Sequence, residues 1–243
     1  MNSMIKKIFC LLLLVAISGF SYSQQAIEFY VKGLSKAKLK DYRGAIADYD
    51  KALEISPVGY LRPYFSRGIA KEILKDYWGA IADYSKIIEE EQSLWYPSID
   101  EAKDLLEDNI GILVYCHFSQ QNIYPERLKI IAYLKRARAK AELKDYTGAM
   151  ADYSKIIAIS PSYDAAVGYL NRARAKADLK DYRGAIEDYD KAIEIIKDCT
   201  IAYLNRGLAK FKLGRKDSGC LDLSKAGELG AENAYDMIQK YCN

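Results

Sequence analysis

The residues best suited to chemistry in this 243-residue sequence are its one histidine, His117, and the adjacent Cys116. A cysteine and a histidine can act together as metal ligands, or as a nucleophile and its base. Adjacent residues on a helix, however, point about 100° apart, and no second histidine or cysteine lies near this pair in the sequence. Because catalytic and metal sites need several converging groups, we predict no catalytic residue, no metal site and no cofactor. The chain is therefore not expected to be an enzyme.

Charged residues are plentiful, but they recur at fixed positions. An aspartate followed three residues later by a lysine occurs in five stretches, at Asp48, Asp83, Asp152, Asp188 and Asp222. A residue that is present in every copy is more typical of a structural role than of a catalytic site. The glycines at 44, 79, 148 and 184 recur in the same way and form no phosphate-binding loop, so we expect no small-molecule substrate.

The recurrence reflects an internal repeat of about 35 residues. Four stretches nearly superimpose: KDYRGAIADYDKALEISP from residue 40, KDYWGAIADYSKIIEE from 75, KDYTGAMADYSKIIAISP from 144 and KDYRGAIEDYDKAIEI from 180. A fifth, GRKDSGCLDLSKAGEL from 214, has diverged. The stretches at 75 and 144 lie two periods apart, so residues 95–129 are expected to form one divergent repeat or an irregular helical insert.

Each unit contains two patterns with a helical period. In one unit, Tyr169, Ala173, Lys176 and Leu179 follow one face of a first helix, and Ala185, Tyr189 and Ala192 follow one face of a second. An aspartate stands between the two patterns, at Asp41, Asp76, Asp145 and Asp181, where its carboxylate can cap the second helix. Small residues such as Gly68 and Ala80 allow the paired helices to approach closely.

A basic residue on the first helix precedes the recurrent aspartate by 16 residues in every unit. A short turn would fold the two helices antiparallel and bring these side chains together. We therefore predict five ion pairs: Lys32–Asp48, Arg67–Asp83, Arg136–Asp152, Arg172–Asp188 and Arg206–Asp222.

These units resemble tetratricopeptide repeats. The small, aromatic and small residues of the family's second helix match Ala185, Tyr189 and Ala192, and the closing proline matches Pro57 and Pro161. The resemblance implies an all-α, right-handed α-solenoid of helix–turn–helix repeats, closed by a capping helix. The expected domain limits are a signal peptide at 1–23, repeats 1–2 at 24–94, the divergent segment at 95–129, repeats 3–5 at 130–233 and the capping helix at 231–243.

The resemblance also implies that four positions of each first helix line a concave groove that binds a protein or peptide. Among them we select the groove candidates Tyr30, Phe65, Ile69, Arg138, Arg174, Leu208 and Phe211. The alternative is that the aromatic residues and leucines in this set belong in part to the core between repeats. Some family members clamp acidic C-terminal tails with lysines and asparagines; Asn171 and Asn205 are present here, but the lysines are not.

The N-terminus predicts export from the cytoplasm, to the periplasm or the extracellular space. Lys6 and Lys7 precede an apolar run at 8–17, and Ser21 and Ser23 place small side chains before a cleavage site at Gln24. The run is too short to span a bilayer comfortably, since a spanning helix needs about 20 residues, so we expect no membrane span in the mature chain. With 36 basic and 33 acidic residues interspersed, the sequence also favours no nucleic-acid partner.

Two cysteines near the C-terminus, Cys220 and Cys242, are predicted to form a disulfide. They lie at similar chain distances on either side of Gly230, where the fifth repeat turns into the capping helix. An oxidising compartment permits the bond. The alternative is two small buried side chains without a bond.

Taken with the resemblance, the sequence favours a scaffold that binds a peptide or helix of an envelope or secreted partner in its groove. A structural subunit of an envelope assembly, which contacts neighbours through its convex faces or ends, is an alternative. An enzyme with its site in residues 95–129 is a third.

Overall fold

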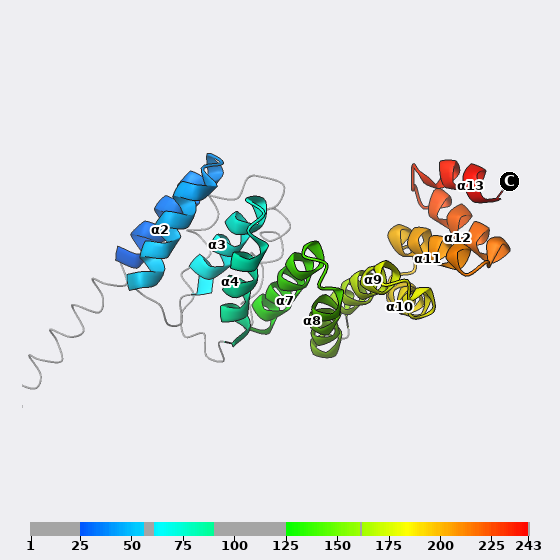
Figure 1. The fold of residues 1–243 in the computed structure, drawn as a ribbon, viewed down its shortest axis with the longest axis horizontal. Helices are drawn as coiled ribbons and strands as arrows, with labels where there is room; N and C mark the ends of the chain where they lie inside the picture. The colour runs from blue at the N-terminus through cyan, green and yellow to red at the C-terminus, as the bar shows by residue number, and fades with distance from the viewer. Residues whose placement is uncertain (1–24, 56–60, 90–124, 161, 243) are drawn as a thin grey trace, which may run out of the picture. The chain divides into compact units, whose positions relative to one another are not determined.

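The computed structural model describes residues 25–55, 61–89, 125–160 and 162–242, and all regular elements in these residues are α-helices (Figure 1). There are eleven in this part of the chain. The first spans residues 25–38. It is followed by α2 (Tyr42–Ile55), α3 (Leu61–Ile73), α4 (Tyr77–Glu89), α7 (Pro125–Glu142), α8 (Tyr146–Ile159), α9 (Tyr163–Asp178), α10 (Tyr182–Ile195), α11 (Thr200–Lys212), α12 (Lys216–Glu228) and α13 (Ala234–Cys242). The signal segment, Cys116, His117, Pro57 and Pro161 lie outside the described residues.

The helices pair in chain order, which confirms the predicted all-α fold of helical hairpins. Repeat 1 is the helix at 25–38 with α2, repeat 2 is α3 with α4, repeat 3 is α7 with α8, repeat 4 is α9 with α10, and repeat 5 is α11 with α12. The last helix, α13, packs against α12. The chain forms two compact units, Met1–Leu128 and Lys129–Asn243. Repeats 1 and 2 belong to the first unit, and repeats 4 and 5, α8, α13 and most of α7 belong to the second.

The start of α7 differs from expectation. The divergent segment was expected to extend to residue 129, but α7 begins at Pro125 and runs for 18 residues. Proline suits the first position of a helix, because its fixed φ is helical and its missing N–H would be unpaired there anyway. Residues 125–129, assigned by sequence to the divergent segment, are therefore the first turn of repeat 3.

The turn inside each hairpin has the same conformation in repeats 1–4. A lysine with a positive φ of 63–64° ends the first helix, at Lys40, Lys75, Lys144 and Lys180. Repeat 5 has Gly214 at this position, with φ 74°. The left-handed residue lets the chain close the helix end, as the hydrogen bond from Asp145 N to Lys140 O at 2.9 Å shows.

The predicted aspartate caps are confirmed in repeats 1–4. The Gly148 N–H donates to the Asp145 carboxylate at 2.9 Å, and equivalent bonds join Gly44 to Asp41, Gly79 to Asp76 and Gly184 to Asp181. Each cap satisfies one of the N–H groups that the first turn of a helix leaves without a partner. The left-handed lysine and the capping aspartate that follows it thus reverse the chain within three residues.

Small side chains bring the two helices of a hairpin together around one buried tyrosine. A Cβ added to Gly68 would lie 2.7 Å from the ring of Tyr84, so the backbone of α3 rests directly on this ring. Tyr49, Tyr84, Tyr153 and Tyr189 occupy the same position in four repeats, and all four are buried. This packing fixes the distance between the first and second helix of a hairpin.

Candidate functional site

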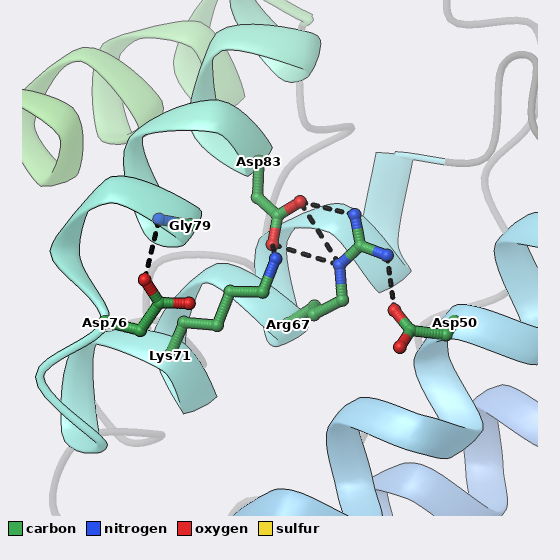
Figure 2. Close-up of polar contacts among 6 residues, drawn as sticks. All are labelled: Asp50, Arg67, Lys71, Asp76, Gly79 and Asp83. Carbon is green, nitrogen blue, oxygen red and sulfur yellow. Dashed lines mark hydrogen bonds and ion pairs between the residues drawn. The ribbon is translucent and has the colours of Figure 1, made fainter.

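A buried aspartate on the second helix binds two cations from the first. In repeat 2, Arg67 Nε donates to both oxygens of Asp83 at 3.0 and 3.1 Å, and Lys71 Nζ lies 2.9 Å from the same carboxylate (Figure 2). The carboxylate is almost fully buried, whereas both cations keep part of their surface in solvent. Two positive groups on one buried negative group offset the cost of removing it from water.

The ion pairs predicted at a separation of 16 residues are confirmed in repeats 2–5 and wrong in repeat 1. Arg136, Arg172 and Arg206 hold Asp152, Asp188 and Asp222 as Arg67 holds Asp83. In repeat 1 the partner of Asp48 is Lys36, at 2.7 Å, and no ion pair between Lys32 and Asp48 is present among the described residues. Lys36 lies one helical turn after Lys32, closer to the loop that joins the two helices. Its side chain therefore reaches the Asp48 carboxylate, whereas that of Lys32 does not.

The second cation of each cluster was missed by the sequence analysis. It stands four residues after the arginine, at Lys71, Lys140, Lys176 and Lys210, with Lys36 as the equivalent in repeat 1. The signal is visible in the sequence, because a basic residue recurs there in all five units.

Three of these arginines also bind the preceding repeat. Arg67 Nη1 donates to Asp50 at 2.5 Å (the bond is drawn as a dashed line in Figure 2), and Arg206 Nη1 donates to Asp190 at 2.6 Å. Arg172 Nη1 donates in the same manner to Ser154, at 2.9 Å. Each of these guanidinium groups also lies over the ring of a tyrosine three residues earlier, 5.2–5.4 Å from its centroid. Because these arginines are fully engaged in holding hairpins together, they are structural and not available to a ligand.

Two other arginines, Arg138 and Arg174, take no part in these contacts between helices. They occupy equivalent positions on α7 and α9, two residues after Arg136 and Arg172, and both are exposed. Among the residues that the structure describes, neither forms an ion pair or a side-chain hydrogen bond. The corresponding residues of repeats 1, 2 and 5 are Leu34, Ile69 and Leu208, so the two charges distinguish repeats 3 and 4.

The side chains around Arg138 and Arg174 show which face of the helix they share. Leu134 and Ala141 of α7 pack against the cluster that contains Tyr153, and Arg138 lies between them at helical spacing. Leu170 and Ala177 of α9 pack in the same way against the cluster of Tyr189, with Arg174 between them. Both arginines therefore lie on the face of the first helix that borders the buried tyrosines.

The charges of these arginines act on Tyr153, the buried tyrosine of repeat 3. Burial raises the pKa of Tyr153 to about 12, while the positive charges of Arg138 and Arg174 oppose this increase. Arg174 acts in the same direction on Tyr189. Tyr153 is 3% exposed, and within the described part of the chain its hydroxyl has no hydrogen-bond partner. Tyr153 is thus under the electrostatic influence of two exposed cations on the first helices of repeats 3 and 4.

The groove candidates of the first unit are partly engaged inside the protein. The hydroxyl of Tyr30 shares a hydrogen bond of 3.3 Å with Ser66 of the next repeat, and its ring lies 5.8 Å from that of Tyr49. The ring of Phe65 lies 6.1 Å from that of Tyr84. These aromatic residues and Ile69 are half-buried. They contribute to packing within and between repeats 1 and 2, in agreement with the alternative that assigns them partly to the core.

At the C-terminal end, Leu208 and Phe211 of α11 are half-buried as well. The ring of Phe211 stacks on that of Tyr241 in α13, with centroids 5.1 Å apart, so this groove candidate has a partner within the chain. The structure joins Cys220 of α12 to Cys242 of α13 by a disulfide, with Cα atoms 5.9 Å apart. This is the pairing predicted from their chain distances to the turn, and it fastens α13 beside α12.

The described residues contain one free cysteine, Cys199, and no group of three or more side chains suited to hold a metal ion. Over the same residues, no helix is both long and apolar enough to cross a membrane.

Comparisons with known proteins agree with this architecture. Tetratricopeptide-repeat models match residues 23–58, 131–163 and 166–199. No curated protein sequence matches the chain. Together with the helix pairs described above, the repeat matches show that the chain contains tetratricopeptide repeats; proteins with such repeats mediate protein–peptide interactions and are typically not catalytic.

Solved structures show the same fold at low sequence identity. The chain is similar to MamA, with 20% identity over 87% of this chain and 95% of that one, and a TM-score of 0.62. It is also similar to MamA residues 41 to the end from Desulfovibrio magneticus RS-1, with 14% identity, coverage of 84% and 94%, and a TM-score of 0.60. A third similar structure is YrrB, described as a TPR protein with an unusual peptide-binding site, with 14% identity, coverage of 93% and 96%, and a TM-score of 0.61.

Proposed function

We propose that this protein is an exported, non-enzymatic scaffold that binds a peptide or helix of an envelope or secreted partner along the first helices of its repeats. The observation that carries the proposal is the contrast between two sets of arginines on the same helices. Arg136 and Arg172 are bound to buried aspartates, whereas Arg138 and Arg174 are exposed and make no ion pair with any described residue. Exposed charges that repeat packing does not use are available to a partner, and arginine is common among residues that dominate interfaces.

Export supports the choice of partner. The N-terminal sequence has the features of a secretory signal, and Cys220 and Cys242 are positioned to form a disulfide, which persists in oxidising compartments. We infer a periplasmic or extracellular location, and hence a partner that is itself in the envelope or secreted.

A peptide library displayed on phage tests the binding face. The library is panned on the full mature chain, and the contacts of selected peptides are mapped by NMR shifts of the protein. We expect the shifts to include Leu134, Leu170 and Leu208, which are half-buried on the first helices. The double substitution Arg138→Glu and Arg174→Glu should weaken binding at least tenfold.

The matched control removes two exposed charges from second helices of the same unit, by Lys155→Glu on α8 and Arg183→Glu on α10. We expect this control to bind within twofold of the unchanged protein. If the arginine double variant also stays within twofold, the groove proposal is wrong.

The alternative, a structural subunit that uses other surfaces, has one observation in its favour. Large apolar side chains are exposed outside the first helices: Trp78 is 72% exposed at the start of α4, Leu221 72% on α12 and Tyr235 65% on α13. Shifts confined to these residues in the same NMR experiment would favour that alternative over groove binding.

A further inference from the structure

We propose that α13 is a redox-controlled cover over one end of the first-helix face. The disulfide between Cys220 and Cys242 holds Tyr241 against Phe211, and its reduction frees the Phe211 ring to bind an aromatic side chain of the partner peptide. This inference rests on the proposed function, because it specifies how access to part of the first-helix face is controlled.

The covering contact is a stack of two aromatic rings. Phe211 on α11 and Tyr241 on α13 have ring centroids 5.1 Å apart and ring planes inclined by 26°. The Phe211 ring also lies against α12, because a Cβ added to Gly219 would come within 3.0 Å of it. Since α11 and α12 form one hairpin, α13 is the neighbour that can leave Phe211 without breaking a repeat.

The disulfide lies directly beside these contacts. Cys220 follows Gly219 on α12, and Cys242 follows Tyr241 on α13, with the Cα atoms of the two cysteines 5.9 Å apart. A covalent bond at this place keeps the last turn of α13 next to the Phe211 ring. It therefore holds Tyr241 where the stack forms.

The other contacts of α13 are few. The helix has nine residues, Ala234–Cys242, of which only Ala234 is buried. A helix of this length is marginal in water unless packing stabilises it. Its start is tied to the end of α12 by the hydrogen bond from Ala231 N to Ala226 O, at 2.9 Å. Reduction should therefore release the C-terminal half of α13 and leave its start in place.

The bond is accessible to thiol–disulfide exchange. Neither Cys220 nor Cys242 is fully buried, and Leu221 beside them is 72% exposed. A dithiol reductant of the thioredoxin class attacks one sulfur through its thiolate, forms a mixed disulfide and displaces the other cysteine. Its second thiol then resolves the mixed disulfide. The protein gains two electrons and two protons as two thiols, and the reductant leaves as a disulfide.

The internal contact indicates what the freed ring binds. Tyr241 already shows how an aromatic side chain is placed on Phe211. Leu208, three residues earlier on α11, is half-buried and lies on the same side of the helix. An aromatic residue of the partner peptide can thus take the place of Tyr241, with an apolar neighbour on Leu208.

Hydrogen exchange followed by mass spectrometry tests the release of α13 in the full mature chain. The oxidised protein is compared with protein reduced by a phosphine and with the variant Cys220→Ser with Cys242→Ser. We expect the amides of residues 237–242 to exchange at least tenfold faster in the latter two, and those of α11 and α12 to keep their rates. The variant should not respond to the phosphine, which excludes an effect through Cys199. Equal exchange of α13 in all three samples would overturn the proposal.

A synthetic peptide of residues 232–241, ENAYDMIQKY, tests the freed ring as a binding site. Its Kd, measured by fluorescence anisotropy, should be at least tenfold lower for the reduced chain than for the oxidised one. Tyr241→Ala in the peptide should abolish this preference, whereas Tyr235→Ala should keep it, because Tyr235 is 65% exposed on α13. Phe211→Leu in the protein keeps an apolar side chain and should weaken binding to the reduced chain at least threefold.

The outcomes separate this proposal from the proposed function. If α13 is released but ENAYDMIQKY binds both redox states equally, the cover is overturned, and panned peptides that contact the first helices leave the proposed function standing. Peptides that are panned on the reduced chain and contact Phe211 without an aromatic residue would overturn the assigned ligand. If no panned peptide contacts the first helices in either state, the proposed function fails, whatever the exchange of α13 shows.

Discussion

Arg206 and Asp222, sixteen residues apart, join the two helices of repeat 5 through two parallel hydrogen bonds, from Nε at 2.9 Å and from Nη2 at 2.6 Å. The third nitrogen of this guanidinium donates to Asp190 in the preceding repeat, and Lys210 Nζ lies 2.7 Å from Asp222 Oδ2, the oxygen that also accepts from Nε. One buried carboxylate thus binds two cations that belong to the packing of three helices. Its removal should be costly.

Asp222→Asn tests this cluster. The amide keeps the shape of the side chain but leaves Arg206 and Lys210 without their buried counter-charge, so we expect a loss of about 3 kcal/mol in the free energy of unfolding. Urea unfolding followed by circular dichroism measures it. Glu228→Gln on the same helix is the control, because its pair with Lys225 is exposed, and it should leave the midpoint unchanged. Equal midpoints for the two variants would contradict a structural role of the cluster.

The left-handed lysines of the hairpin turns predict a stabilising substitution. Lys144 has φ 63°, a conformation that costs a residue with a Cβ about 1 kcal/mol and costs glycine almost nothing. Lys144→Gly should therefore raise the free energy of unfolding by up to about 1 kcal/mol. The same change inside α8, Lys155→Gly, should lower it by about 1 kcal/mol, because glycine is unfavourable within a helix. Thermal unfolding of both variants checks the opposite signs, and a loss of stability in Lys144→Gly would refute the argument.

The link between α12 and α13 predicts a dependence on redox state. Cys220 and Cys242 are 22 residues apart, and a closed loop of this size contributes about 3 kcal/mol by restricting the unfolded chain. Cys220→Ser with Cys242→Ser, or the addition of dithiothreitol, should lower the thermal midpoint by similar amounts. Cys199→Ser should have no such effect, because Cys199 is free. Full alkylation of Cys220 and Cys242 in unreduced protein, detected by mass spectrometry, would show that the bond is absent.

The proposed export predicts a defined N-terminus for the mature protein. We expect cleavage before Gln24, or within one or two residues of it, and recovery of the chain outside the cytoplasm. Intact mass and N-terminal sequencing of protein from fractionated cells check both points. Recovery of intact chains that begin at Met1 in the cytosol would contradict the prediction.

Sequence periodicity predicted the hairpins, the aspartate caps and the four Arg–Asp ion pairs among the five pairs proposed, because these features depend on intervals within one repeat. Contacts between repeats were not predicted. The reach of Arg172 to Ser154 spans two helical hairpins, and nothing in the spacing of these residues reveals the angle at which the hairpins pack. The predicted pair Lys32–Asp48 was wrong for a related reason. A sequence interval identifies residues on facing helices, but it does not show which of two lysines one helical turn apart, Lys32 or Lys36, contacts the carboxylate.

The candidate site, too, could be predicted only in part from the sequence. Differences between repeat copies identified Arg138 and Arg174, since a residue that changes between otherwise similar units is not required by the common fold. The sequence could not show that both arginines act on Tyr153, because this tyrosine recurs in four repeats and has the appearance of pure core. Their effect on its pKa appears only in the folded protein. Phe211 was selected as an open groove residue because the sequence does not show that Tyr241 stacks on it.

The arginine contacts described above between successive hairpins all have one direction. Arg172 and Arg206 each find an acceptor in the hairpin that precedes them, Ser154 and Asp190, and never in the one that follows. The equivalent residue of the last hairpin, Ser224, is exposed on α12, and α13 contains no arginine. A chain that emerges from a ribosome or a translocation channel N-terminus first therefore has each acceptor in place before the arginine that needs it arrives. Shortening the array from the C-terminal end leaves complete hairpins, whereas shortening it from the N-terminal end leaves a guanidinium without its acceptor.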